Sequence, residues 1–210
     1  MKLDVFDWTG KVVSDFEISD EISQTPYRED IIHEIVRWQR AKARAGTQSI
    51  KSRSQVSGST RKIRPQKESG KARQGDGRES HFRGGGAAHG RFPRDYEFKV
   101  MKKVKKLGLR SAFAKRLSEN RVALLETSEH GASKTKDFVN LLNNLRDVLK
   151  VESKKILFVS DNIDDLCIRN LHYIDILPVR GLNVLDMVRH DLILSDINSM
   201  QAISDRLVSK

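Results

Sequence analysis

Apolar residues recur along the chain with two different periods, and these periods predict its first elements. Apolar residues alternate with polar ones from Leu3 to Ile18, and a Thr-Gly-Lys turn at Gly10 interrupts them, which predicts a pair of strands. After Thr25-Pro26 the apolar residues change to helical spacing, with Ile32 and Ile35 on one face. We therefore expect a short strand pair followed by a helix that ends near residue 46.

The second half of the chain alternates short apolar runs with amphipathic segments. A helix is expected from about residue 99 to 117, interrupted near Gly108. Beyond it we predict strands at 122–125, 155–160, 173–177 and 192–194, and helices at 136–149, 164–170, 183–188 and 199–207. Alternation of this kind is typical of a mostly parallel sheet with helices on both faces. The predicted fold class is α/β, a three-layer α/β/α domain.

Residues 45–95 follow neither period. They include five large apolar side chains, nine of the 13 glycines and 12 Lys or Arg residues. Such a segment cannot bury enough apolar surface to offset the entropy lost on ordering. We therefore predict a globular α/β domain made of residues 1–44 and 96–210, with residues 45–95 inserted in it as a long extended basic loop.

Charge points to the partner of this loop. The 210 residues carry 39 Lys and Arg against 28 Asp and Glu, a net charge of +11, yet residues 40–116 alone hold 23 bases and five acids. Segregation on this scale favours a polyanion, and nucleic acid is the commonest one. No stretch approaches a membrane span, and the acidic start is unlike a secretory signal, so we expect a cytoplasmic protein without a membrane partner.

Other chemistry has weak support in the sequence. The glycines at 84–86 match no phosphate-binding motif, and close approach of two backbones explains them better. Asp161, Asp164 and Asp165 follow a predicted strand, where carboxylates suit a magnesium site. Asp161 and Asn162 also suit a turn or helix cap, and we favour the cap. The lone Cys167 is expected to be packed and inert. We expect no cofactor, no metal and no small-molecule substrate.

Aromatic side chains fall into two groups. Trp8 and Trp38 are expected to pack against the core. Phe82, Phe92 and Tyr96 lie within the basic segment, where they either stack on bases or anchor the base of the loop.

Lys and Arg residues separated by small residues suit binding to folded RNA, because an extended chain can follow the crevices of such an RNA. We assign RNA binding to the following residues: Lys51, Arg53, Arg61, Lys62, Arg64, Gln66, Lys67, Lys71, Arg73, Arg78, Arg83, Arg91, Arg94, Lys102, Lys103, Lys106 and Arg110.

Several motifs in this region resemble one family in order and spacing. They are Ser-Gly-Ser-Thr-Arg-Lys-Ile-Arg-Pro-Gln-Lys at 57–67, Gly-Lys-Ala-Arg-Gln-Gly at 70–75, Phe-Arg-Gly-Gly-Gly at 82–86 and Leu-Gly-Leu-Arg-Ser-Ala at 107–112. The chain resembles the bacterial large-subunit ribosomal protein four, the L-four family, over nearly its whole length.

The resemblance implies a core sheet of about four strands and a protein that is not an enzyme. It implies binding to large-subunit (23S-type) ribosomal RNA early in subunit assembly, with other large-subunit proteins as neighbours. It also implies that the loop reaches the wall of the polypeptide exit tunnel, where the nascent chain passes. The tunnel tip would comprise Arg64, Pro65, Gln66, Lys67, Glu68, Gly70 and Lys71.

The sequence departs from the family pattern at two acids. Glu68 stands where the family has a glycine that is free to adopt positive φ, and Glu79 stands where it tends to have serine. Glu79 and Asp76 either lie near phosphates or pair with a neighbouring arginine.

Two rival functions remain. One is an α/β enzyme acting on RNA or nucleotides, with the loop as a substrate clamp and Asp161 and Asp165 as its catalytic candidates. The other is a free basic chaperone or regulator that binds nucleic acid transiently.

Overall fold

The computed structural model describes residues 1–127, 134–149, 155–161 and 166–208. The chain divides into two compact units. We call Met1–Gln39 with Lys99–Lys210 the sheet unit, and Arg40–Phe98 the loop unit. Asp164 and Asp165 lie outside the described residues, as does the side chain of Cys167.

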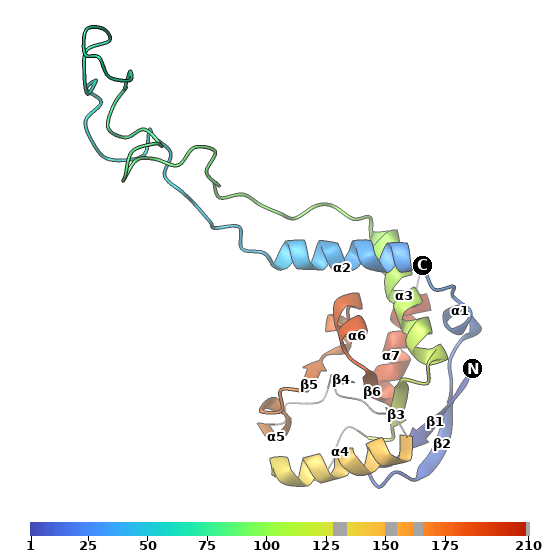
Figure 1. Ribbon diagram of the computed structural model, residues 1–210. Helices are drawn as coiled ribbons and strands as arrows, with labels where there is room; N and C mark the ends of the chain where they lie inside the picture. Colours follow the sequence, from blue (N-terminus) through green and yellow to red (C-terminus); the bar gives the residue numbers. More distant parts are fainter. Residues whose placement is uncertain (128–133, 150–154, 162–165, 209–210) are drawn as a thin grey trace. The chain divides into compact units, whose positions relative to one another are not determined.

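The sheet unit is built on one sheet (Figure 1). Its described strands are β1 (Lys2–Phe6), β2 (Val12–Glu17), β3 (Val122–Leu125), β4 (Ile156–Val159), β5 (Ile174–Leu177) and β6 (Leu192–Asp196), in the order β2-β1-β3-β6-β4-β5. Only the β1–β2 pairing is antiparallel among these strands. The predicted mostly parallel α/β fold is confirmed.

The expected strand number was too low. The family resemblance gave about four strands, and β3, β6, β4 and β5 form that parallel core. The N-terminal hairpin extends the same sheet, because Val5 and Phe6 of β1 pair with Leu124 and Leu125 of β3. The described residues therefore form six strands.

Helices cover both faces of the sheet. They are α1 (Asp20–Ser23), α2 (Glu29–Ala43), α3 (Lys102–Ser118), α4 (Thr135–Leu149), α5 (Leu166–Arg169), α6 (Val184–Arg189) and α7 (Ile197–Val208), with a 3₁₀ turn, η1, at Val179–Gly181. The four-residue α1 and the turn η1 have no counterpart among the predicted elements. None of the described helices is long and apolar enough to cross a membrane.

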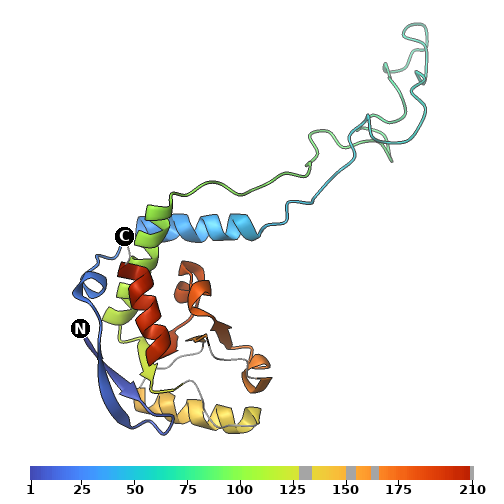
Figure 2. The same cartoon turned by 180° about the vertical axis from the view of Figure 1, so that it is seen from behind.

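The core has two layers because successive strand residues point to opposite faces. In β4, Leu157 packs into the layer that contains residues of α2, α3, α6 and α7, and Phe158 packs into the layer of α4 and α5. Figures 1 and 2 show α7 and α4 on opposite sides of the sheet. Trp8 lies in the second layer, 5.7 Å from Phe138 between ring centroids, which confirms its core assignment.

Helix α3 runs through Gly108 without a break, so the expected interruption there was wrong. A Cβ at Gly108 would lie 2.1 Å from Cδ1 of Ile35 in α2. The glycine therefore allows α2 and α3 to approach closely, and this packing outweighs its low helix propensity.

Candidate nucleic-acid interface

The loop unit consists of two chain segments joined by isolated backbone hydrogen bonds, and none of its residues 44–98 lies in a helix or strand. The N–H of Ile50 donates to the carbonyl of Arg91 at 3.0 Å, and that of Ala87 donates to Lys51 at 3.0 Å. Nearer the tip, Ile63 donates to Gly75 at 3.0 Å. The two segments thus run side by side without a regular ladder (Figure 1).

Gly86 is one place where the two segments approach closely. A Cβ there would lie 2.4 Å from the backbone nitrogen of Arg53, so a larger residue would force the segments apart. Gly85 and Gly86 thus confirm the expected close approach of backbone to backbone, whereas Gly84 has open space around it and forms a bend with φ of 81°. The phosphate-loop alternative has no support in this geometry.

An ionic cluster takes the place of a hydrophobic core in the loop unit. Asp76 is 3% exposed, and one of its carboxylate oxygens accepts hydrogen bonds from Nη2 and Nε of Arg78 at 2.7 and 3.0 Å. Nε of Arg53 lies 3.1 Å from the other oxygen. Arg53 also reaches Glu79, at 3.2 Å. Both acids therefore pair with arginines, one of the two arrangements that the sequence left open.

The surroundings of Asp76 favour its charged form. The hydrogen bond from Arg78, with the nearby positive charges of Arg53 and Arg78, holds the pKa of the Asp76 carboxyl below its ordinary value of 3.8. Arg78 is half-buried and is occupied by this acid, whereas Arg53 is exposed. Of the two predicted RNA ligands, Arg53 is the one that still faces solvent.

A second cluster of positive charge surrounds Tyr96. The guanidinium carbons of Arg44 and Arg94 lie 3.8 and 4.3 Å from its ring centroid. A hydrogen bond from Arg94 and the charges of Arg44, Arg94 and Arg91 lower the pKa of the Tyr96 hydroxyl from its ordinary value of 10.0. A stacked guanidinium keeps its N–H edge available for phosphate. Tyr96 thus anchors arginines at the base of the loop, one of the two alternatives above.

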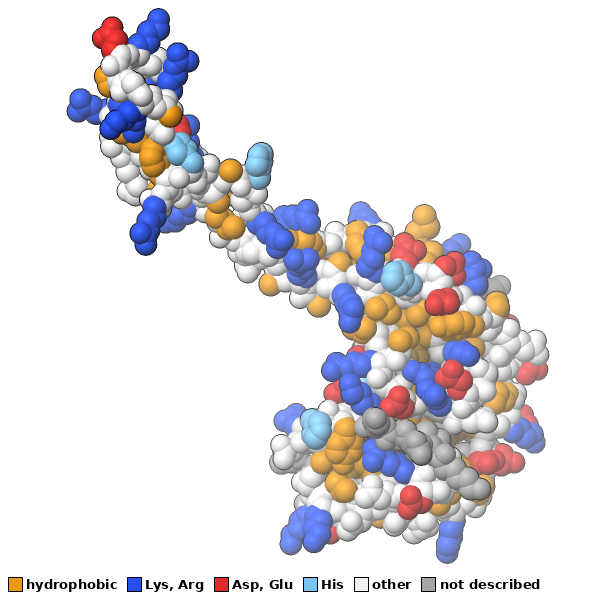
Figure 3. Space-filling view, in the orientation of Figure 1, with side chains coloured by type: hydrophobic (Ala, Val, Ile, Leu, Met, Phe, Trp, Pro, Cys, Tyr) orange, Lys and Arg blue, Asp and Glu red, His pale blue; other side chains and the backbone are white. Residues whose placement is uncertain are grey.

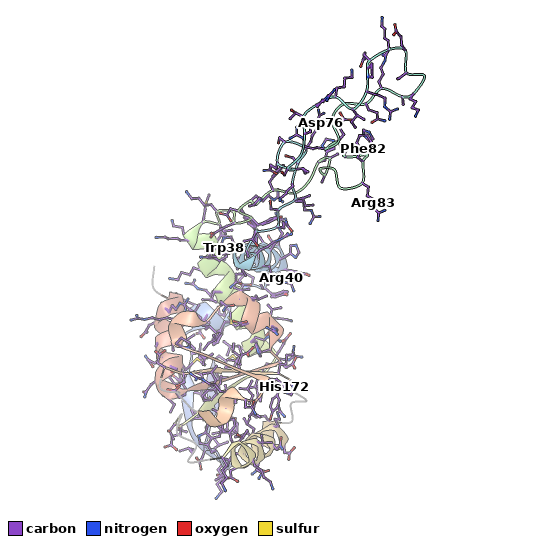
Figure 4. The ribbon with its side chains drawn as sticks, turned by 90° about the vertical axis from the view of Figure 1, so that its left-hand side faces the viewer. Trp38, Arg40, Asp76, Phe82, Arg83 and His172 are labelled. Atoms are coloured by element: carbon purple, nitrogen blue, oxygen red, sulfur yellow. The ribbon has the colours of Figure 1, made fainter. Side chains whose placement is uncertain are left out.

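Most predicted RNA-binding side chains of the loop unit face solvent. The exposed ones are Lys51, Arg53, Arg61, Lys62, Gln66, Lys67, Lys71, Arg73, Arg83, Arg91 and Arg94. Lys and Arg side chains project at many points from the visible face of this unit (Figure 3), and Arg83 points away from both segments (Figure 4). Phe92 is exposed, whereas Phe82 is half-buried against His81.

The tip has one unusual backbone angle. Glu68 adopts φ of 71°, a conformation that non-glycine residues rarely take, and Gly70 follows with φ of 59°. The glycine that the family resemblance expects at 68 would adopt this angle without strain.

The four predicted bases of α3 divide into two kinds. Lys102 and Lys103 are exposed and Lys106 is half-buried. Arg110 instead donates from Nε and Nη2 to the carbonyl of Leu207, at 3.1 Å for Nε. This contact ties α3 to the end of α7, which is a structural role.

The strand-end acid that the enzyme hypothesis needs is also part of the scaffold. Oδ1 of Asp161 accepts the backbone N–H of Val179, at the start of η1, at 2.8 Å. This contact joins Asp161 to the start of η1, whereas the turn after Asp161, where the sequence favours a cap, lies outside the described residues.

Comparison with known proteins identifies the relatives of this chain. The sequence pattern described as the ribosomal protein L4/L1 family matches residues 16–206. The chain belongs to this family. It is 39% identical over 196 residues to the large ribosomal subunit protein uL4 of Anaeromyxobacter dehalogenans, covering 92% of each chain. It is 34% identical to the proteins of the same name from Desulfatibacillum aliphaticivorans and Paramagnetospirillum magneticum, covering 99% of this chain in both cases.

Family membership settles the choice between enzyme and structural protein. The relatives are named as ribosomal proteins, and the chain is a ribosomal protein, not an enzyme.

Two basic residues that were not among the predicted RNA-binding residues, Arg44 and Lys105, contact aromatic side chains from distant parts of the chain. Arg44 and Tyr96 meet although 52 positions separate them, and Trp38 and Lys105 meet in the same way. The available signal was the position of Arg44 and Tyr96, which flank the glycine-rich segment on either side.

Proposed function

We propose that the chain is a structural component of the large ribosomal subunit that binds large-subunit ribosomal RNA, acts early in subunit assembly, and contributes its loop tip to the wall of the polypeptide exit tunnel. Its partners are this RNA, neighbouring large-subunit proteins and, in passing, the nascent polypeptide. The proposal includes a cytoplasmic location on a bacterial-type ribosome, which the names of the relatives, large ribosomal subunit proteins uL4, support.

The charge balance of the loop unit carries this proposal. The unit holds 15 Lys and Arg residues against five acids. Asp76 and Glu79 pair with arginines of the loop, and Glu97 lies 3.9 Å from Lys42, so these acids add no exposed negative patch. The remaining bases project from an irregular backbone, as expected for a chain that follows RNA crevices and not a groove.

The tip assignment rests on position and exposure. Arg64 is half-buried, while Pro65, Gln66, Lys67, Glu68, Gly70 and Lys71 are exposed. A tip that meets both RNA and the tunnel lumen needs side chains that are free of packing within the protein.

Crosslinking in cells tests the proposal. Ultraviolet light should join the protein mainly to large-subunit ribosomal RNA, and the crosslinked peptides should fall between residues 53 and 94. Diverse RNAs, or crosslinks confined to residues 155–180, would contradict it. In a parallel test the protein should sediment with large subunits through a high-salt wash, whereas a free chaperone or regulator would be released.

A further inference from the structure

The sheet unit contains a pocket that lies outside the loop unit. It has a volume of about 440 Å³ and is lined by residues of α2, α3, α6 and α7 and by the segment between η1 and α6. This volume is within the range of roughly 300–1,000 Å³ typical of small-molecule sites. Its apolar wall includes Leu109, Leu182 and Val184, all buried. The pocket is therefore built on rigid elements.

The pocket is strongly positive. Lys102, Lys105, Lys106 and Arg206 contribute to its lining, and no Asp or Glu does so among the residues that the structure describes. Arg206 also donates to the carbonyl of Val179 at 2.5 Å, which fixes its guanidinium near the rim. Charge complementarity therefore selects an anionic occupant.

An aromatic ring lies within this positive lining. Nζ of Lys105 is 3.5 Å from the ring centroid of Trp38, which lies on α2 beside α3 (Figure 4). Indole is a large flat surface for stacking, and an ammonium group over it is held near the ring by the cation–π attraction. The pocket thus contains an aromatic ring and, 3.5 Å from the centre of that ring, a positive charge.

A polar group of fixed orientation completes the lining. Oε1 of Gln39 accepts the backbone N–H of Leu185 at 3.0 Å. Because the oxygen of the amide is used in this contact, its two N–H groups remain as donors. Gln39 lines the pocket, so an occupant can accept from them. Side-chain amides of this kind recognise the edges of bases.

We propose that this pocket binds one unstacked nucleotide of single-stranded RNA. The base displaces the Lys105 ammonium from the face of Trp38 and stacks there, and the edge of the base accepts a hydrogen bond from Gln39. The phosphates on either side of the base are neutralised by Lys102 and Lys105. The inference rests on the proposed RNA-binding function and adds to it a specific site outside the loop.

The observations favour RNA over an acidic peptide. A carboxylate needs cations only, whereas this pocket combines cations with an indole and an apolar wall, the combination that a base with its phosphates requires. A paired base in a duplex cannot enter a pocket, so the occupant is single-stranded.

The matched control lies elsewhere on the same unit. Lys115 lies over Tyr27, 5.3 Å from its ring centroid, but Lys115 is also paired with Glu119 at 3.3 Å. It is thus a lysine–aromatic pair whose charge is already neutralised. The pocket variants are Trp38→Leu and Lys105→Gln, and the control variants are Tyr27→Leu and Lys115→Gln.

The test measures binding of the full chain to a short oligouridylate at several salt concentrations. Trp38→Leu should weaken binding roughly 5- to 150-fold, the range for loss of one stacked base, with the same salt dependence. Lys105→Gln should reduce the slope of log affinity against log salt by about 0.7, as for one phosphate on a single strand. Both control variants should bind like the original chain.

Each result decides a different question. Equal losses for Trp38→Leu and Tyr27→Leu, or no loss for either pocket variant, would overturn the pocket while RNA binding stands. Failure of the unaltered chain to bind large-subunit ribosomal RNA would overturn the proposed function itself. Competition by polyglutamate that affects the original chain but not Trp38→Leu would assign the pocket to an acidic peptide. Thermal unfolding of every variant checks that it folds. If Trp38→Leu fails to fold, Lys105→Gln still tests the pocket, because it changes only a half-buried side chain at the rim.

Discussion

Gly108 of α3 and Ile35 of α2 are in direct contact, because a Cβ at Gly108 would lie 2.1 Å from Cδ1 of Ile35. Replacing a helical glycine with alanine normally stabilises a protein by about 1 kcal/mol. Here Gly108→Ala should instead lower the free energy of unfolding by about 1–3 kcal/mol, through overpacking. Denaturant titration measures this value.

Ile35→Val removes the clashing Cδ1 atom and serves as the partner in a double-mutant cycle. Alone it should cost about 0.5–1.5 kcal/mol. Combined with Gly108→Ala, it should give a chain more stable than Gly108→Ala alone. Additive losses of stability would show that the two residues are not coupled.

The Asp76 cluster makes the order of the loop unit sensitive to acid. The pKa of Asp76 is lowered, first by the hydrogen bond from Arg78, so this carboxylate stabilises the folded loop fully above the ordinary pKa of 3.8. The stabilisation is lost as the pH falls below that value and through the lowered pKa. Amide exchange of residues near Arg78, followed as the pH falls, should show protection disappearing in this range.

The control for this prediction is Asp76→Asn, which removes the carboxylate charge at every pH. In that variant, protection near Arg78 should be low at neutral pH and nearly independent of pH below 5 or so. Unchanged protection in Asp76→Asn would show that the cluster does not order the loop.

Removing the charge of an exposed Lys or Arg should change RNA binding, whereas removing the charge of one that is hydrogen-bonded within the protein should change stability. Changing Lys67, Lys71 and Arg73 together to glutamine should reduce the salt dependence of RNA binding by roughly 0.7–0.9 for each phosphate that is no longer neutralised, with unchanged stability. An unchanged slope would mean that these side chains face the tunnel and not phosphate.

Arg110→Gln is the counterpart of the triple variant. Because Arg110 donates to the carbonyl of Leu207, this change should lower the free energy of unfolding by about 1–3 kcal/mol. The salt slope should stay as it was. A reduced slope with unaltered stability would make Arg110 an RNA ligand, as the sequence alone predicts.

Glu68 offers a test of backbone strain at the tip. Glu68→Gly and Glu68→Gln both remove the negative charge, but only glycine adopts φ near 71° without strain. If RNA binds the tip in this conformation, Glu68→Gly should bind up to about fivefold more tightly than Glu68→Gln, equivalent to about 1 kcal/mol. Equal affinities would mean that RNA binds a different tip conformation.

The strands were predictable from sequence because their side chains alternate between two buried faces, as Leu157 and Phe158 do. The break expected at Gly108 failed because helix propensity is local, whereas the contact with Ile35 joins residues far apart in the chain. The place of the hairpin in the main sheet was missed for a related reason, since period alone does not say which strands pair.

The charged loop was predictable because its bases are dense in the sequence itself. The contacts that individual Lys and Arg residues make could not be predicted. Arg78 and Arg110 look like Lys67 in sequence, and only folding shows that Asp76 and the Leu207 carbonyl occupy them. The Asp76–Arg78 spacing was a weak signal, because such short-range pairs form only when the backbone turns suitably.

The contact between Gly108 and Ile35 has a consequence for how the loop can vary. The contact packs α2 closely against α3. The points at which the chain leaves the sheet unit and re-enters it are therefore fixed by the packing of these helices. The inserted residues can then be exchanged, shortened or lengthened without shifting the register of β3 or of the strands after it. The loop unit is in this sense an interchangeable part, and a relative's loop grafted between residues 40 and 98 should leave the scaffold unchanged.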